Sequence, residues 1–308
     1  MRVSIFYRMI SSLGLVLLTG TSTLNLVYGQ CESQTYYSLP EAIASSSCAE
    51  RLSLRLNKKE TLSSTIAMLG KLRYLDMQKN QFRYLPDELG SLDSLEHLIA
   101  SENQLKKLPN SLGNLSQLHI LQLDKNNLDE LPHTISKLQN LKVLDISWNN
   151  IASFGKQFSR LKQLETFNAQ HNHLLYLPEE FGDLQGLRLL QLNYNRLSFL
   201  PESITMLREL TQLDVSFNSL EALPETIGVM KSLQVLTLNN NALTYLPESI
   251  GDLENLEMIL LADNGISDLP ASIGRLKKLR TLVLMNNPVK KETITRLQQQ
   301  LPGTRIMF

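Results

Sequence analysis

Leucine recurs at a constant interval along most of the chain, and an asparagine follows in fixed register. In a typical unit, apolar residues alternate around a short segment, as in Leu210-x-x-Leu213-x-Val215, and Asn218 comes three residues later. Side chains that alternate between two faces predict a short strand at this segment. One unit cannot bury its apolar side alone, so neighbouring units must stack and share one continuous core.

The asparagines define the period of the repeat, because every step between them is 23 residues. The series is Asn80, Asn103, Asn126, Asn149, Asn172, Asn195, Asn218, Asn241, Asn264 and Asn287, and Asn57 extends it by one step towards the N-terminus. We expect each amide to turn inward and pair with backbone groups of its own and the adjacent turn. An unpaired buried group costs about 1–3 kcal/mol, so these residues are predicted to form a structural ladder.

Prolines predict the second element of each unit. Eight of the 11 prolines follow a leucine in the same register, at Pro86, Pro109, Pro132, Pro178, Pro201, Pro224, Pro247 and Pro270. Proline suits a first helical position, since its missing N–H would be unpaired there anyway. Acidic residues follow several of these prolines, and they favour the positive end of a helix. Each unit is therefore expected to continue into a short helical segment opposite its strand.

One complete unit has the pattern LxxLxLxxNxLxxLPxxIGxL, which resembles the typical 23-residue class of leucine-rich repeats. The pattern is similar to Shoc-type and Scribble-type arrays and to bacterial exported leucine-rich-repeat proteins. The resemblance covers about residue 49 to the C-terminus. It implies an α/β solenoid, or horseshoe, with a concave parallel β-sheet, short helical or 3-10 segments on the convex side and about eleven repeats. It also implies a protein-binding role, without naming the ligand.

One unit departs from this pattern. Phe154-Gly155 replaces Leu-Pro, and Phe158 takes the place of the convex isoleucine. We expect this coil to be bent or locally loosened. The first unit also lacks its proline and has Ser63 instead.

The N-terminus has the order of features that a secretory signal peptide needs. Arg2 and Arg8 precede a short apolar run over residues 13–18, and small residues surround the end of the segment at Gly29. A membrane anchor is the alternative, but polar residues dilute the stretch, and a spanning helix wants about 20 mainly apolar residues. We predict a signal peptide at residues 1–29, an extracytoplasmic mature chain (secreted, periplasmic or on the cell surface) and no transmembrane segment in it.

The two cysteines, Cys31 and Cys48, follow the predicted cleavage point. In an oxidising compartment such a pair predicts one disulfide, worth about 3 kcal/mol in the chain-entropy model. Two free thiols, or a lipid anchor on Cys31, are the alternatives. Residues 30–50 are then an N-terminal cap with a helix at 39–46. Residues 51–289 are the repeats, and residues 290–308 are a C-terminal cap with a helix at 290–300 and a half-strand at 304–308.

A column of rings suggests where a ligand binds. The residue before the ladder asparagine is aromatic or imidazole in four consecutive units, at Trp148, His171, Tyr194 and Phe217. On outward positions of a concave sheet these rings would form a stripe, because neighbouring strands lie about 4.8 Å apart. Carboxylates and amides stand beside the stripe at Asp124, Asp145, Asn168, Gln170, Gln191, Asn193 and Asp214. Rings dominate binding hot spots, although a stacked ladder that only stiffens the sheet is the alternative.

A second outward cluster contains Met258, Leu260, Val283 and Met285. Exposed apolar clusters often mark contact sites. The alternative, which we favour, is that the C-terminal cap or a side loop covers them.

Composition and motifs exclude most other functions. Thirty basic residues balance thirty acidic ones, so no field attracts nucleic acid. His171-x-His173 lacks a third metal ligand at a suitable spacing. The sequence has no glycine-rich phosphate loop and no nucleophile elbow. We therefore predict a non-enzymatic module without metal or cofactor whose partner is another protein. A cell-surface adhesion or glycan-binding structural component is the alternative.

Overall fold

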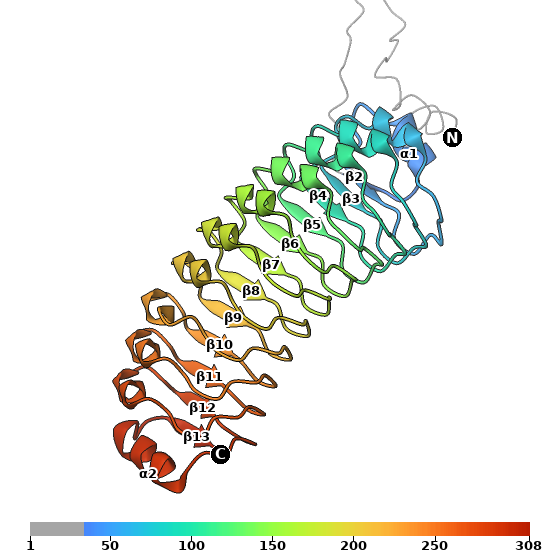
Figure 1. Cartoon of the computed structure of the whole chain (residues 1–308). Helices are drawn as coiled ribbons and strands as arrows, with labels where there is room; N and C mark the ends of the chain where they lie inside the picture. Colours follow the sequence, from blue (N-terminus) through green and yellow to red (C-terminus); the bar gives the residue numbers. More distant parts are fainter. Residues whose placement is uncertain (1–33) are drawn as a thin grey trace, which may run out of the picture.

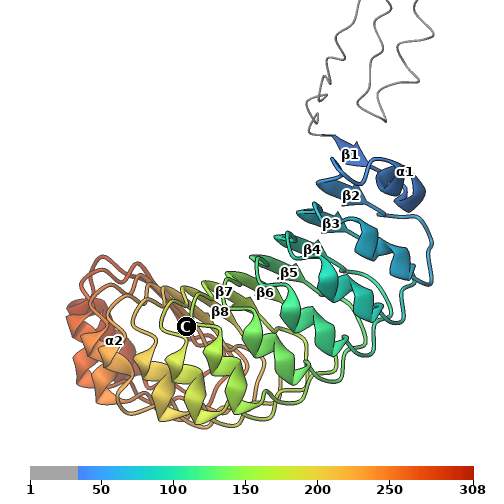
Figure 2. The same cartoon turned by 90° about the horizontal axis from the view of Figure 1, so that it is seen from above.

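Residues 34–308 are described by a computed structural model, in which 13 strands pair in parallel and in sequence order. Figures 1 and 2 show an arc, with the strands along its inner side and short helices along its outer side. The predicted leucine-rich-repeat solenoid is therefore confirmed as the fold class. The predicted signal peptide at residues 1–29 lies outside the described residues, as does Cys31, so the cleavage and the Cys31–Cys48 disulfide stay predictions.

The strands are short because each coil gives only its central apolar residue and the two flanking residues to the sheet. They are β1 (Thr35–Tyr36), β2 (Arg51–Ser53), β3 (Tyr74–Asp76), β4 (His97–Ile99), β5 (Ile120–Gln122), β6 (Val143–Asp145), β7 (Thr166–Asn168), β8 (Leu189–Gln191), β9 (Gln212–Asp214), β10 (Val235–Thr237), β11 (Met258–Leu260), β12 (Thr281–Val283) and β13 (Arg305–Met307). Within the repeats the register equals the period, so Leu144 lies opposite Leu121 on one side and Phe167 on the other.

The convex segments are 3-10 helices, the tight form that suits short pieces of chain. They are η2 (Ser64–Met68), η3 (Asp87–Ser91), η4 (Asn110–Asn114), η5 (His133–Lys137), η6 (Lys156–Arg160), η7 (Glu179–Asp183), η8 (Glu202–Met206), η9 (Ile227–Val229), η10 (Glu248–Asp252) and η11 (Ala271–Arg275). Their buried isoleucine, leucine or phenylalanine side chains face the strand leucines and form one core along the arc.

The departing unit keeps a regular helix, so the expectation that it would be loosened is wrong. Gly155 precedes η6 with φ −71° and ψ 154°, close to the φ −61° and ψ 143° of Pro132 in the preceding coil. Phe154 fills the leucine position, and its ring centroid lies 4.9 Å from that of Phe158. Phe158 in turn lies 5.0 Å from Phe167 in β7, so packed rings hold this coil in place of the proline.

Short helices cover both ends of the core. At the N-terminal end, α1 (Leu39–Ala44) is two residues shorter than the predicted helix, and β1 adds a strand that the sequence pattern does not reveal. At the C-terminal end, α2 (Lys291–Gln300) buries Ile294 and Leu297 against the last coil. The predicted half-strand is present as β13 beside β12. These elements shield apolar surface that terminal repeats would otherwise expose.

The ladder asparagines tie each coil to the one before it. The Asn149 side-chain amide donates to the carbonyl oxygens of Leu123 at 3.0 Å, Ile146 at 2.9 Å and Ser147 at 3.2 Å. Its oxygen accepts from the Leu128 N–H at 2.9 Å. Asn149 therefore satisfies backbone groups of two coils at once.

Replacing Asn149 by alanine should destabilise the protein by at least about 1–3 kcal/mol, because several buried backbone groups lose their partner. Asn150→Ala is the matched control, since Asn150 is exposed and should change stability by less than about 0.5 kcal/mol. Urea unfolding of both variants measures the difference. Equal losses would show that the buried amide has no special role.

Replacing Gly155 by proline should raise stability by about 0.4–1 kcal/mol, because the residue already has a proline-like φ and the unfolded chain loses freedom. Ser63→Pro is the comparison. Ser63 has φ −67°, but its hydroxyl oxygen accepts from the Thr65 N–H at 3.3 Å, and losing this cap offsets the gain. Thermal unfolding should rank Gly155→Pro above Ser63→Pro, and a destabilised Gly155→Pro would contradict the argument.

Candidate functional site

Four rings form a continuous parallel stack, which we call the ring stack (Trp148, His171, Tyr194 and Phe217). The centroids of Trp148 and His171 are 3.6 Å apart with an interplanar angle of 16°. The next two steps are both 4.1 Å, with angles of 10° and 8°. These spacings are shorter than the strand spacing of about 4.8 Å, as expected where side chains converge on the inner side of an arc.

The ring stack lies beyond the strands, which corrects the sequence-based placement on outward strand positions. Trp148 comes three residues after β6 ends at Asp145, in a turn with φ 55°. His171, Tyr194 and Phe217 have φ of 51°, 56° and 53°. The carboxyl ends of all parallel strands lie at one edge of the sheet, so the ring stack follows this edge. The left-handed conformation costs non-glycine residues about 1–2 kcal/mol each, and ring pairs return about 0.5–1.5 kcal/mol.

The rings remain accessible despite their stacking. Trp148 is 51% exposed, and Tyr194 and Phe217 are each 40% exposed. His171 and Tyr194 each have a neighbouring ring on both faces, so their edges face solvent. Only the outer faces of Trp148 and Phe217 are free of another ring of the stack.

The predicted polar residues beside the ring stack are connected across coils. The Asp145 carboxylate accepts from the Ser147 N–H at 2.9 Å and from the Asn168 amide at 3.1 Å. One coil further, the Asn193 amide donates to Gln170 Oε1 at 3.1 Å. The structure therefore brings acids and amides of neighbouring coils into contact.

The remaining predicted acids and amides lie on the same side of the sheet. The Asp214 carboxylate ends β9 and accepts from the Ser216 N–H at 3.0 Å. The Asp124 carboxylate accepts from the hydroxyl of Ser101. Gln191 ends β8 and is half-buried. These positions share one face because the register repeats from coil to coil.

Burial changes the titration of two groups at this site. Burial raises the pKa of the Asp145 carboxyl, and the charge of Asp124 acts in the same direction. Burial lowers the pKa of His171, so its imidazole is neutral at neutral pH. Among residues 34–308, no ion pair includes Asp124, Asp145 or Asp214.

The predicted apolar cluster near the C-terminal end is only partly covered. Met258 and Leu260 are half-buried on β11, and Val283 is buried on β12 beside Met307 of β13. Met285 stays 45% exposed. The favoured expectation that the C-terminal cap covers this cluster therefore holds for Val283 and not for Met285.

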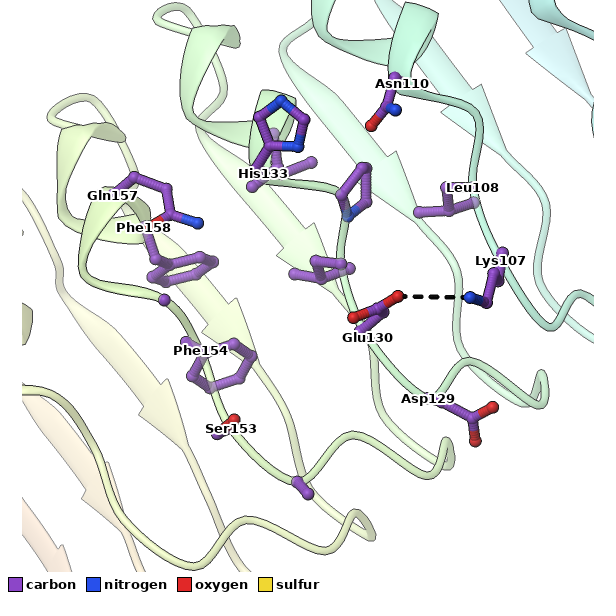
Figure 3. A pocket seen from close by; sticks show the side chains of 15 residues that line it. Lys107, Leu108, Asn110, Asp129, Glu130, His133, Ser153, Phe154, Gln157 and Phe158 are labelled. Carbon is purple, nitrogen blue, oxygen red and sulfur yellow. Dashed lines mark ion pairs between the residues drawn. The ribbon is translucent and has the colours of Figure 1, made fainter.

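Sequence reasoning missed a hollow on the flank of the arc, shown in Figure 3. It has a volume of about 580 Å³, its floor includes Phe154 and Phe158, and its rim includes Lys107 and Glu130. The Lys107 ammonium and the Glu130 carboxylate pair at 3.5 Å. The substitution of Phe-Gly for Leu-Pro was the only sequence signal at this place.

Residues 34–308 contain no group of three or more His, Cys, Asp or Glu side chains placed to hold a metal ion. In the same residues, no helix has the length and apolar character needed to cross a bilayer.

Comparison with known families and structures supports the repeat architecture. The leucine-rich repeat region family matches residues 51–168, and a second leucine rich repeat family matches residues 208–266 and 231–289. The structure of a TDR receptor is similar with a TM-score of 0.78 and 25% identity, over 90% of this chain and 50% of that one. No curated protein matches the chain.

Two further solved structures show the same fold. An internalin (inlF) from Listeria monocytogenes has a TM-score of 0.68 and 18% identity, over 86% of this chain and 82% of that one. The plant peptide hormone receptor RGFR1, solved in complex with RGF2, has a TM-score of 0.67 and 23% identity, over 82% of this chain and 46% of that one. The chain thus spans about half the length of the two receptors.

Because the pKa of His171 is lowered in the folded chain, we predict how the stability of the protein depends on pH. The unfolded chain binds the His171 proton more readily than the folded chain, so this residue should cost stability as pH falls through the unfolded value of 6.5. His171→Phe keeps a ring in the stack and removes the titration. Between pH 7.5 and about pH 5, urea unfolding should show a smaller loss of stability for His171→Phe than for the unmodified chain. Identical losses would contradict the assignment.

Proposed function

The chain belongs to the leucine-rich-repeat proteins, and from this premise we propose that it is a non-enzymatic module that binds another protein. The binding surface is the concave side along the carboxyl ends of the strands, centred on the ring stack. The main support for this proposal is that the four rings of the ring stack lie on one another and still expose a large part of their surface. Clustered exposed rings of this kind are typical of binding hot spots.

The geometry of the ring stack favours a protein over a glycan. A sugar packs its C–H face onto an open ring face, but two of the four rings have both faces covered by neighbours. Ring edges carry the positive part of the aromatic quadrupole, so they suit carbonyl oxygens and apolar side chains of a polypeptide. Adhesion through a glycan stays the second candidate, since no other ring of the stack covers the outer faces of Trp148 and Phe217 and amides lie beside the stack.

The similar structures agree with a polypeptide ligand. The plant relative is a peptide hormone receptor in complex with RGF2. Its fold is shared by this chain, which supports a polypeptide as the ligand.

Export is part of the proposal. We infer that residues 1–29 are a signal peptide and that Cys31 and Cys48 form a disulfide beside α1. The predicted mature chain begins at Gln30. The intact mass of the chain isolated from its own cells should equal that of residues 30–308 minus the two hydrogen atoms lost when the disulfide forms. Reduction of the disulfide should add these two hydrogen atoms back. A lipid-modified Cys31, or an uncleaved N-terminus, would contradict this part of the proposal.

The binding proposal is tested with the variant Trp148→Ala/Tyr194→Ala. A partner is first captured by cross-linking on the surface of the source cells, identified by mass spectrometry and purified. Calorimetry should then show that its affinity falls at least tenfold in the variant, a loss of about 1.4 kcal/mol. Tyr84→Ala/Tyr245→Ala is the matched control, because these exposed rings lie outside the ring stack.

Two results would contradict the proposal. An unchanged affinity of Trp148→Ala/Tyr194→Ala for the purified partner would exclude the ring stack as the binding surface. Binding to polysaccharide on a glycan array, without any protein partner, would support the adhesion alternative.

A further inference from the structure

The concave side beside the ring stack carries negative charge without an internal counter-charge. Asp145 ends β6 and Asp214 ends β9, and neither takes part in an ion pair among the described residues. In the coils that contain β6 to β10, no lysine or arginine stands at the outward strand positions or in the turn that follows, up to the position of the ring-stack residues. Lys125 occupies that same position one coil before Trp148, and its ammonium lies 3.8 Å from the Glu102 carboxylate.

Hydrogen-bond acceptors are also in surplus on this side. Asn193 is 9% exposed, and its amide donates to Gln170, but Asn193 Oδ1 has no hydrogen-bond partner. The hydroxyl of Ser216, at the equivalent position of the next coil, has no partner either, but it can donate as well as accept. A buried acceptor without a partner is unfavourable unless a ligand supplies a donor. Ammonium and guanidinium groups carry only donors, whereas sugar hydroxyls also need donors, so a basic side chain is the better complement.

The spacing of the two carboxylates selects an organic cation over a metal ion. β6 and β9 are three strands apart, which is about 14 Å at the usual spacing between strands. One metal ion cannot span this distance with coordination bonds of about 2.0–2.6 Å. An extended peptide that crosses the strands advances about 3.3–3.6 Å per residue. Two basic residues four positions apart would therefore reach Asp145 and Asp214.

We propose that the polypeptide bound on the concave side carries two basic residues four positions apart. Their side chains bind Asp145 and Asp214, with Asp124 adding charge beside Asp145. This inference rests on the proposed function and specifies the chemistry of its ligand. The peptide crosses the strands in either chain direction, since side chains alone set the order of charges.

The test uses fluorescein-labelled peptides and the full chain at low salt. The probe RSGSRSGL, or its reversed form LGSRSGSR, should bind at least tenfold more tightly than ESGSESGL. It should also bind more tightly than RRSGSSGL, in which the two arginines are adjacent. Asp145→Asn/Asp214→Asn should lower the affinity for the probe at least tenfold, and Asp145→Glu/Asp214→Glu should retain most of it. The control Asp87→Asn/Asp183→Asn removes equal charge on the convex side and should have no effect.

Circular dichroism and thermal unfolding check that each variant is folded.

Several outcomes would overturn the inference. These are equal binding of ESGSESGL, no effect of Asp145→Asn/Asp214→Asn, or no binding of either arginine probe at about 1 mM, a concentration that detects even weak binding. Calorimetry with the purified partner separates this failure from failure of the proposed function. If Trp148→Ala/Tyr194→Ala abolishes partner binding and Asp145→Asn/Asp214→Asn does not change it, the ring stack binds a protein that is not basic.

Discussion

The buried amide that closes each coil is the interaction on which the rest of the structure depends. Asn149 can bond to Leu123 and Ile146 only if the chain turns sharply just before it, and Trp148 makes that turn with φ 55°. The left-handed turn directs the preceding side chain outward while the asparagine goes inward. The ring stack thus occupies a position that the ladder creates in every coil, whatever residue stands there.

The structural role of the ring stack is compatible with the binding role that we propose for it. Rings at 3.6–4.1 Å stabilise adjacent turns that are individually unfavourable. The same arrangement fixes their edges in a rigid row, which lowers the entropy that a partner would lose on binding. Stiffening of the turns therefore does not compete with recognition, and preorganisation of this kind is what a binding surface needs.

The periodicity of the sequence predicted those features of the fold that depend only on the spacing of residues along the chain. The 23-residue step placed the strands, the convex segments and the ladder, since identical coils must stack in identical register. It could not place the ring stack beyond the strands, because the left-handed turn is a backbone property that alternation of apolar residues does not encode. It also missed β1, the unpartnered oxygen of Asn193 and the hollow beside Phe154, all of which depend on packing between particular side chains.

The fold itself does not require a carboxylate at the end of β6. Asn168 and Gln191 occupy the equivalent positions of β7 and β8, so a neutral amide fits the same place. Burial raises the pKa of Asp145, which means that the folded chain binds this proton more readily than the unfolded chain. Stability is therefore lost as pH rises from the unfolded value of 3.8 through the raised folded value, and the protein carries that loss at neutral pH. Because an amide fits the equivalent positions of the neighbouring coils, the proposed basic ligand gives this carboxylate a role that the fold does not require.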